Sequence, residues 1–233
     1  MKAIILMGGE GTRLRPLTYK IPKPLIPVQG KTLTEHVLDI LKKYQIKDVI
    51  FSVAYKKEMI KNYFGNGEKF GVNISYVEEP EPLGTAGPLI IMNKQKKQLK
   101  ERFFVINGDN LFDINLSEML QFHINCKATV TIALSRVDDQ RSYGKVEMEN
   151  NRIVEFKEKP KEKTAGYVNS GYYIFEPEVF ELVKNKERAM IETDIFPILA
   201  KKRVLYGFKS NGLWFDTGTP ERYEKVKKEW KLR

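Results

Sequence analysis

The residues best suited to chemistry form a glycine-rich loop near the N-terminus. The sequence GGEGTRLRP at residues 8–16 follows directly on the apolar run Lys2–Leu6. Absent side chains let backbone N–H groups approach a phosphate, and open α/β sheets bind their ligands at the carboxyl ends of strands. Arg13 adds a positive charge to this loop. The pattern predicts a binding site for a phosphorylated ligand.

A second cationic group follows in the segment IPKPL at residues 21–25. Its two prolines fix the backbone on either side of Lys23, because the proline ring restricts φ. A lysine held in this way directs its ammonium at one place. We interpret Lys23 as part of the same phosphate site as Arg13.

Two widespread phosphate-binding motifs are poorly matched. A dinucleotide fingerprint started at Gly9 and Gly11 reaches Leu14 where its last glycine belongs, so that match is weak. A nucleoside-triphosphatase loop ending in GKT at residues 30–32 needs a glycine where Leu25 stands, so that match fails.

The elements that must position these residues alternate between apolar runs and helical patterns, which predicts a sheet with crossover helices. Strands are expected at residues 2–6, 49–54, 74–77, 103–106, 128–134, 145–148, 152–156, 168–175, 204–208 and 213–215. Helices are expected from Thr34, near 58–64, after Gly84, near 116–122, and from Pro220 with Thr219 as N-cap. The first half is typical of an α/β fold and the second half of an α+β fold.

Composition excludes several classes of protein. The 233 residues are 42% hydrophobic, and 40 Lys+Arg against 30 Asp+Glu give a net charge of +10. Cys126 is the single cysteine, which excludes disulfides within the chain and favours a reducing, cytoplasmic compartment. No apolar run approaches the ~20 residues that span a bilayer, so no membrane segment is expected. The lysine runs lack a nucleic-acid-binding signature and are interpreted as solvated helix faces.

Six motifs in order resemble the sugar nucleotidyltransferases, the nucleoside-diphosphate-sugar pyrophosphorylases. The resemblance begins with AIILMGGEGTRLRPLTYKIPKPLIPVQGK at residues 3–31. It continues with EEPEPLGTAGPL (78–89), FFVINGD (103–109), EFKEKP (155–160), VNSGYYIF (168–175) and GLWFDTGTPERY (212–223). It implies a single catalytic domain over 1–233, with a nucleotide-binding half at 1–135 and a sugar-binding half at 136–233. It also implies a Rossmann-like, doubly wound mixed sheet with a smaller α+β sugar-binding region. Only ten residues follow Tyr223, so no C-terminal β-helix is expected.

The resemblance implies that a sugar 1-phosphate oxygen attacks the α-phosphorus of a nucleoside triphosphate and releases pyrophosphate. The nucleophile is anionic at pH 7, so no general base is needed, and His36 and His123 are interpreted as structural. The reaction requires positively charged groups that bind the polyphosphate. By resemblance Arg13 binds the triphosphate and Lys23 the α-phosphate region. The implied nucleotide-binding residues are Leu6, Gly8, Gly9, Gly11, Thr12, Arg13, Glu79 and Gly84.

Carboxylates at strand ends are the candidates for a metal site. Asp109 follows the strand 103–106 and Asp216 the strand 213–215, and both match family positions that hold Mg²⁺, which prefers oxygen ligands. Asp113 and Asp194 are interpreted as a turn residue and a helix cap. Catalysis is assigned to Arg13, Lys23, Asp109 and Asp216.

The second half implies a sugar-phosphate site. Glu158, Lys159 and Pro160 are expected to close a β-hairpin, with Glu158 on sugar hydroxyls and Lys159 on the phosphate. Asn169 both donates and accepts hydrogen bonds, and Gly144 lets the backbone approach the sugar ring. Family members often have Ala at the position of Ser170, which bears on packing alone.

The base is expected over the end of the first strand and against Glu79 and Gly84. An ionised Glu79 accepts two hydrogen bonds, which suits the adjacent N1–H and N2–H₂ donors of guanine. The segments GTAGPL, IFPILAK and GLWFDTGTP favour the family branch that makes GDP-mannose from GTP and mannose 1-phosphate. The alternatives are uridylyl or thymidylyl transfer to glucose 1-phosphate, guanylyl transfer to another sugar phosphate such as a heptose, an inactive nucleotide-sugar-binding regulator, and a nucleic-acid-binding module. Homo-oligomerisation is left open.

Overall fold

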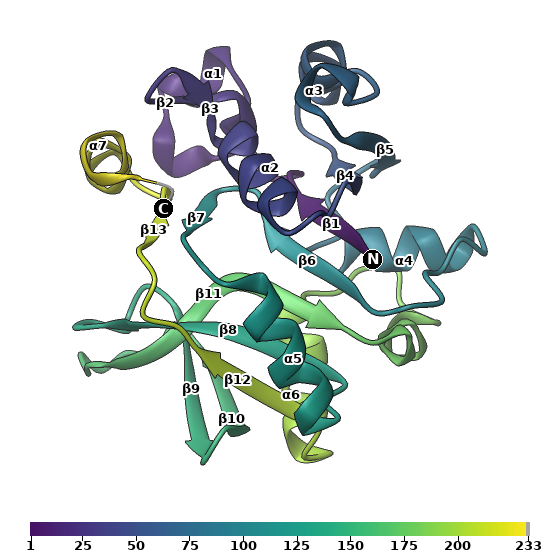
Figure 1. Cartoon of the computed structure of the whole chain (residues 1–233), viewed down its shortest axis with the longest axis vertical. Helices are drawn as coiled ribbons and strands as arrows, with labels where there is room; N and C mark the ends of the chain where they lie inside the picture. Colours follow the sequence, from purple (N-terminus) through teal and green to yellow (C-terminus); the bar gives the residue numbers. More distant parts are fainter. Residues whose placement is uncertain (232–233) are drawn as a thin grey trace. The chain divides into compact units, whose positions relative to one another are not determined.

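The computed structural model describes residues 1–231 and divides into two compact units (Figure 1). The first unit contains Met1–Pro82, Ile106–Asp113 and the chain from Leu213, and the second contains Leu83–Val105 and Ile114–Gly212. The units do not coincide with the halves expected on either side of residue 135. Which substrate each unit binds stays a prediction.

A parallel sheet forms the centre of the first unit. Strand β1 (Lys2–Leu6) pairs with β4 (Asp48–Val53), and β4 pairs with β5 (Asn73–Glu78), all in parallel register (Figure 1). Helix α2 (Leu33–Lys43) connects β1 to β4, and α3 (Lys57–Phe64) connects β4 to β5. The middle of β1 is fully buried, as expected for a central parallel strand.

Strand β1 has a neighbour on each side, and β4 is one of them. On the other side, the N–H of Gly108 donates to the carbonyl of Leu6 (3.0 Å), so the end of β6 (Phe103–Asn107) lies beside the end of β1. The order in which strands are added to the sheet therefore reverses at β1. Such a position is a topological switch point, where open sheets bind ligands. The doubly wound arrangement expected from the sequence is present.

Local signals explain the helices next to this site. Helix α2 begins in a capping box, in which the Thr32 hydroxyl accepts from the N–H of Glu35 (3.2 Å) and the Glu35 carboxylate accepts from the N–H of Thr32 (2.6 Å). Helix α7 (Pro220–Glu229) has Thr219 as its N-cap, as the sequence predicts. Leu33 also belongs to α2, one residue earlier than expected.

The first unit contains short elements that the sequence did not predict. Strand β7 (Asn110–Phe112) pairs antiparallel with β13 (Trp214–Asp216), and β2 (Pro27–Val28) pairs with β3 (Lys31–Thr32). Helix α1 spans Leu17–Lys20, and 3₁₀ turns span Thr12–Leu14, Lys23–Leu25 and Glu68–Phe70. The β7–β13 pairing matters most, because it places Asp216 beside the residue that follows Asp109.

The second unit is built on a mixed sheet. Strand β8 (Val130–Val137) pairs antiparallel with β11 (Gly166–Phe175) and parallel with β12 (Leu205–Lys209). Strand β10 (Arg152–Glu158) pairs antiparallel with β12 and with β9 (Gly144–Glu149). Its helices are α4 (Gly87–Lys94), α5 (Leu116–Cys126) and α6 (Phe196–Lys201), with a 3₁₀ helix at Pro177–Val183 and a π-helix at Ile191–Ile195 (Figure 1).

One expectation about this sheet is wrong. Glu158, Lys159 and Pro160 do not close a hairpin, because β10 and β11 are not neighbours; β9 pairs with both. The hairpin is the preceding one, β9–β10, which turns at Asn150 (φ 57°).

None of the described helices is long and apolar enough to cross a membrane. The strands of residues 1–231 do not form a β-helix.

Candidate active site

Two groups from distant parts of the sequence meet at the carboxyl ends of the first unit's strands. The ammonium of Lys23 donates to Oδ2 of Asp109 in an ion pair. Asp109 follows β6, which ends beside β1. Lys23 lies in the 3₁₀ turn Lys23–Leu25 between Pro22 and Pro24, and its side chain is only 10% exposed. The constrained lysine expected from the sequence therefore points at a carboxylate of the same site.

Positive charge keeps the Asp109 carboxyl ionised. Burial by itself raises the pKa of Asp109, but the charge and hydrogen bond of Lys23, with the nearby charge of Arg13, hold that pKa below its ordinary value. Arg13 is thus near enough to influence Asp109. The three side chains form one electrostatic cluster.

Asp216 joins the cluster through the β7–β13 pairing. The carbonyl of Asp109 accepts hydrogen bonds from the N–H (3.2 Å) and the hydroxyl (2.8 Å) of Thr217. The carboxylate of Asp216 accepts from Nη1 of Arg222, in the first turn of α7. The sequence predicted Asp216 but missed Thr217 and Arg222, whose roles depend on where β13 and α7 meet.

The surroundings of Gly218 test whether a metal ion fits this site. A Cβ added at Gly218 would lie 2.8 Å from Oδ1 of Asp216 and 3.0 Å from Nη2 of Arg13, so both groups come close to this glycine and leave no room for a side chain. Mg²⁺ binds through one or two carboxylates together with substrate phosphates. Asp109 and Asp216 supply such a donor set, and no larger cluster of His, Cys, Asp or Glu able to hold a metal occurs in residues 1–231. The two carboxylates fit a magnesium ion whose remaining ligands would come from a nucleotide.

The glycine-rich loop leaves space above the sheet. Nothing lies within 4 Å of a Cβ added at Gly9, and the side chains of Thr12 and Arg13 are exposed. The loop is fixed from below, because the Thr18 hydroxyl donates to the carbonyl of Gly11 (2.9 Å). An anchored backbone with an open face suits a polyphosphate.

Glu79 lies at the same edge of the first unit, just after β5. It is 7% exposed, and its Oε1 accepts from the hydroxyl of Ser52 (2.8 Å). A Cβ added at Gly8 would lie 3.5 Å from that oxygen, so Glu79 adjoins the strand end where the base is expected. The Glu79 side chain therefore does not face solvent. Ser52, within an apolar strand, was missed by the sequence analysis.

The second unit brings together three of the expected sugar-phosphate residues. Glu158 pairs with Gly144 across β10 and β9, and a Cβ at Gly144 would lie 2.4 Å from the Phe156 ring and 3.0 Å from Oε2 of Glu158. The N–H of Lys159 donates to the carbonyl of Tyr143 (3.0 Å), and its ammonium lies 3.4 Å from Oε1 of Glu158. The glycine is required here because the Phe156 ring and the carboxylate occupy the space of a side chain.

Asn169 adjoins this group through β11. The preceding Val168 pairs with Lys145, the neighbour of Gly144. The Asn169 side chain accepts from the N–H of Gly171 (2.9 Å) and donates to the Tyr173 hydroxyl (2.9 Å), at a bulge in the strand. An amide still has one donor and acceptor capacity left for a ligand. Ser170 is fully buried and donates to the carbonyl of Ala133 (2.5 Å), which accounts for a hydroxyl in this core.

Gly84 lies in the second unit, where its backbone (φ 91°) packs against Ala189. A Cβ there would lie 2.2 Å from the Ala189 carbonyl oxygen.

The adjoining Thr85 hydroxyl donates to Oε2 of Glu192 (2.5 Å), in the π-helix. Burial raises the pKa of Glu192, the charge of Glu158 adds to that rise, and Lys159 opposes it. The sequence analysis missed Glu192, a carboxyl group near the expected sugar-phosphate residues. Its position in a π-helix, an element frequent at functional sites, is seen only in the structure.

The two histidines are structural, as expected. Nε2 of His36 contacts the carbonyl of Val28 (2.8 Å), and Trp230 donates to its Nδ1 (3.1 Å). Nδ1 of His123 contacts the Thr131 hydroxyl (2.8 Å) and its Nε2 contacts Glu176 (3.2 Å).

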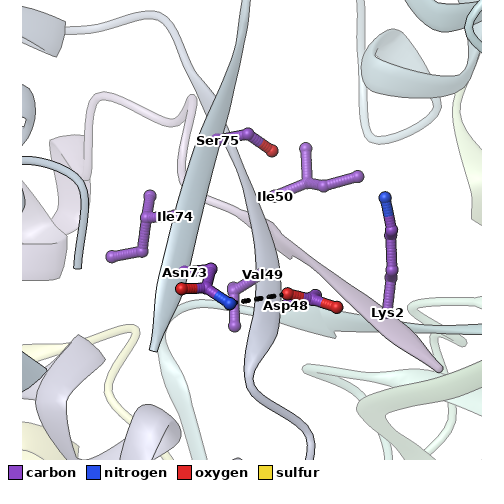
Figure 2. Close-up of a pocket in the computed structure, with 7 residues that line it drawn as sticks. All are labelled: Lys2, Asp48, Val49, Ile50, Asn73, Ile74 and Ser75. Atoms are coloured by element: carbon purple, nitrogen blue, oxygen red, sulfur yellow. Dashed lines mark hydrogen bonds between the residues drawn. The ribbon is translucent and has the colours of Figure 1, made fainter. Parts of the chain in front are cut away.

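A shallow cavity of about 250 Å³ in the first unit lies elsewhere (Figure 2). Lys2, Asp48 and Asn73, at the starts of β1, β4 and β5, line it, and Asn73 donates to Asp48 (2.9 Å). It is therefore at the opposite strand ends from Gly8 and Glu79.

Comparison with known proteins identifies similar sequences and structures. Residues 2–231 match the nucleotidyl transferase family. The chain is 38% identical over 226 residues to the mannose-1-phosphate guanyltransferase beta-B of Xenopus laevis, covering 96% of this chain but 62% of that protein. It is 38% identical over 229 residues to the D-glycero-alpha-D-manno-heptose 1-phosphate guanylyltransferase of Aneurinibacillus thermoaerophilus, covering 98% of both. A solved structure from Bacillus anthracis, a putative glucose-1-phosphate thymidylyltransferase, is 30% identical with a TM-score of 0.88, covering 97% of this chain and 94% of that one.

The fold and the match over residues 2–231 lead to one conclusion: the chain belongs to the nucleotidyl transferase family of sugar-1-phosphate nucleotidyltransferases.

Proposed function

We propose that this protein transfers GMP from GTP to mannose 1-phosphate, forming GDP-mannose and pyrophosphate. The observation that carries the reaction type is the cluster of Arg13, Lys23, Asp109 and Asp216 at the switch point of the first unit. Such a cluster offers positive charge to phosphates and oxygen ligands to a metal. Nucleotidyl transfer requires both.

The chain's own residues neutralise and orient the triphosphate. An oxygen of the sugar 1-phosphate forms a bond to the α-phosphorus while the bond to the pyrophosphate oxygen breaks. Lys23 and Arg13 stabilise the negative charge on the phosphoryl oxygens, and the N–H groups of Gly9–Thr12 bind the rest of the polyphosphate. A Mg²⁺ ion held by Asp109 and Asp216 would supply further charge neutralisation and alignment.

The sugar phosphate is assigned to the residues of the second unit. Lys159 binds its phosphate, Glu158 and Asn169 bind its hydroxyls, and Gly144 permits the close approach of the backbone. The grouping of Glu158, Lys159 and Gly144 at one end of β9 and β10 supports this assignment.

Guanine is the proposed base. Two relatives at 38% identity are guanylyltransferases, and the buried Glu79 offers acceptors beside Gly8. A single cysteine in 233 residues fits a cytoplasmic enzyme.

The heptose relative supports a second candidate sugar. This chain covers 98% of that protein but 62% of the Xenopus guanyltransferase. D-glycero-α-D-manno-heptose 1-phosphate shares the manno ring with mannose 1-phosphate, so both place the same ring hydroxyls before Glu158 and Asn169.

Pyrophosphate release separates these possibilities. Purified enzyme with Mg²⁺ is given ATP, CTP, GTP, UTP or dTTP, each with mannose, heptose or glucose 1-phosphate. The proposal expects the highest kcat/KM for GTP with mannose 1-phosphate. A preference for the heptose phosphate with GTP would change the sugar alone, whereas a preference for UTP or dTTP with glucose 1-phosphate would overturn the substrate assignment. No turnover with any pair would favour the inactive regulator.

A further inference from the structure

We propose that Ser52 is a positioning residue for base selection, which holds the Glu79 carboxylate in the orientation that reads guanine. The inference rests on the proposed function, because it assumes a guanine nucleotide at the end of β1. It adds a determinant of specificity that has no contact with the sugar or the phosphates.

Ser52 occupies the most constrained position available for this task. It is 1% exposed on β4, the strand between β1 and β5, and its register partners are Leu6 and Val77. Its carbonyl accepts from the N–H of Met7 (2.9 Å). Paired strands on both sides fix its backbone, so its hydroxyl is a fixed donor.

The Glu79 carboxylate takes its orientation from that donor. Ser52 Oγ donates to Oε1 of Glu79 (2.8 Å), and the Glu79 N–H donates to the carbonyl of Val53 (2.9 Å). Rotation about the terminal torsion of glutamate is otherwise soft. The hydrogen bond from the serine hydroxyl therefore restricts the planes that the Glu79 carboxylate can adopt. An ionised carboxylate offers about four acceptor positions, and the hydrogen bond from Ser52 uses one of them.

Guanine requires such a fixed plane. Its N1–H and N2–H₂ donors are adjacent, and a bidentate acceptor must align both oxygens with the base. A carboxylate free to rotate keeps one good hydrogen bond and weakens the other. Hypoxanthine has N1–H but no 2-amino group, so the ratio of GTP to ITP use measures the second hydrogen bond.

The neighbouring Glu78, the last residue of β5, has different partners. Glu78 is exposed and pairs with Lys57 and Lys61 (both 2.8 Å), whose hydrogen bonds lower its pKa to about 2. Its partners are partly exposed lysines, whereas Glu79 accepts a hydrogen bond from a buried hydroxyl on the adjoining strand.

The experiment measures kcat/KM for GTP and ITP, with saturating sugar phosphate, in wild type, Ser52→Ala and Ser52→Thr. Ser52→Ala is expected to lower the GTP/ITP ratio by about tenfold, the size expected for loss of a well-oriented hydrogen bond to a charged group. The change falls on KM for GTP, while kcat and KM for the sugar phosphate stay within about twofold. Ser52→Thr keeps the hydroxyl and is expected to restore the ratio. Ser75→Ala, an exposed serine on β5, is the matched control and leaves the ratio unchanged.

Two results would overturn the inference. One is a folded Ser52→Ala enzyme, with a wild-type melting temperature, that keeps the wild-type GTP/ITP ratio. The other is a Ser52→Thr enzyme of normal melting temperature whose ratio equals that of Ser52→Ala. Failure of the proposed function can be told apart from failure of this inference. A wild type that does not prefer GTP to UTP contradicts the proposed function, and this is seen before any Ser52 variant is compared.

Discussion

Lys23 and Asp109 form an ion pair although 86 positions separate them in the sequence. The 3₁₀ turn after Pro22 presents the ammonium, and the end of β6 presents the carboxylate. Asp216 is paired in the same way with Arg222, so both carboxylates of the site lie against a cation.

The first prediction concerns the two metal carboxylates. Asp109→Asn and Asp216→Asn should each reduce kcat by at least about a hundredfold, because the lost charge acts mainly in the transition state. GTP affinity, measured by calorimetry, should change by less than tenfold. Asp113→Asn is the matched control and should keep normal turnover. Near-normal kcat in Asp216→Asn would remove Asp216 from the site.

The second prediction separates the two lysines. Lys23→Met should depress kcat more than either KM, whereas Lys159→Met should raise KM for the sugar phosphate by about tenfold or more and leave KM for GTP unchanged. Methionine preserves the apolar stem, which matters most for the buried Lys23. Initial rates with each substrate varied in turn test the split. Equal effects of both variants on both substrates would show that the assignment is wrong.

The sequence alone predicts the framework of this site, and the reasons are local. The strand at Lys2–Leu6, the Thr219 cap and the Pro22–Lys23–Pro24 segment occur as expected because adjacent residues determine them. The hairpin expected at Glu158 is wrong because strand pairing depends on distant partners.

The residues whose roles the sequence analysis missed share one property. The side-chain contacts of Ser52 and Arg222 form only where two elements meet. Ser52 looks like one polar residue in an apolar strand, and Arg222 like one more charge in a basic helix. Composition and periodicity hold no signal for either contact.

The third prediction concerns the base. Uracil and thymine present one donor between two acceptors and would leave the Glu79 carboxylate against a carbonyl oxygen. Glu79→Gln should therefore narrow the GTP/UTP ratio of kcat/KM by about tenfold, equivalent to ~1.4 kcal/mol. Glu78→Gln, the exposed neighbour, should leave the ratio unchanged. A wild type that favours UTP or dTTP with Glu79 intact would show that this side chain does not read the base.

The fourth prediction concerns stability and pH. Burial lowers the pKa of His123, although the hydrogen bond that its ring makes to the Glu176 carboxylate opposes the shift. The folded protein then holds the neutral imidazole, while the unfolded chain takes up a proton near its ordinary pKa of about 6.5. This contribution to stability is present above that pH and is lost as the pH falls through the lowered folded pKa.

Urea unfolding of wild type and His123→Gln at intervals from pH 8 to pH 5 tests this. The wild type should lose more unfolding free energy than the variant as the pH falls, since the carboxylates common to both cancel in the comparison. Parallel curves would show that His123 does not contribute.

The most direct test of the central claim follows the atoms of the transfer. Mannose 1-phosphate carrying ¹⁸O in its non-bridging phosphate oxygens is incubated with GTP, Mg²⁺ and enzyme, and the products are analysed by mass spectrometry. Attack of the sugar phosphate on the α-phosphorus predicts GDP-mannose that retains all the label, together with unlabelled pyrophosphate, and Asp109→Asn should form neither at a comparable rate. Pyrophosphate release with GMP and no GDP-sugar, or no product at all from the wild type with any nucleoside triphosphate and sugar 1-phosphate, would contradict the account.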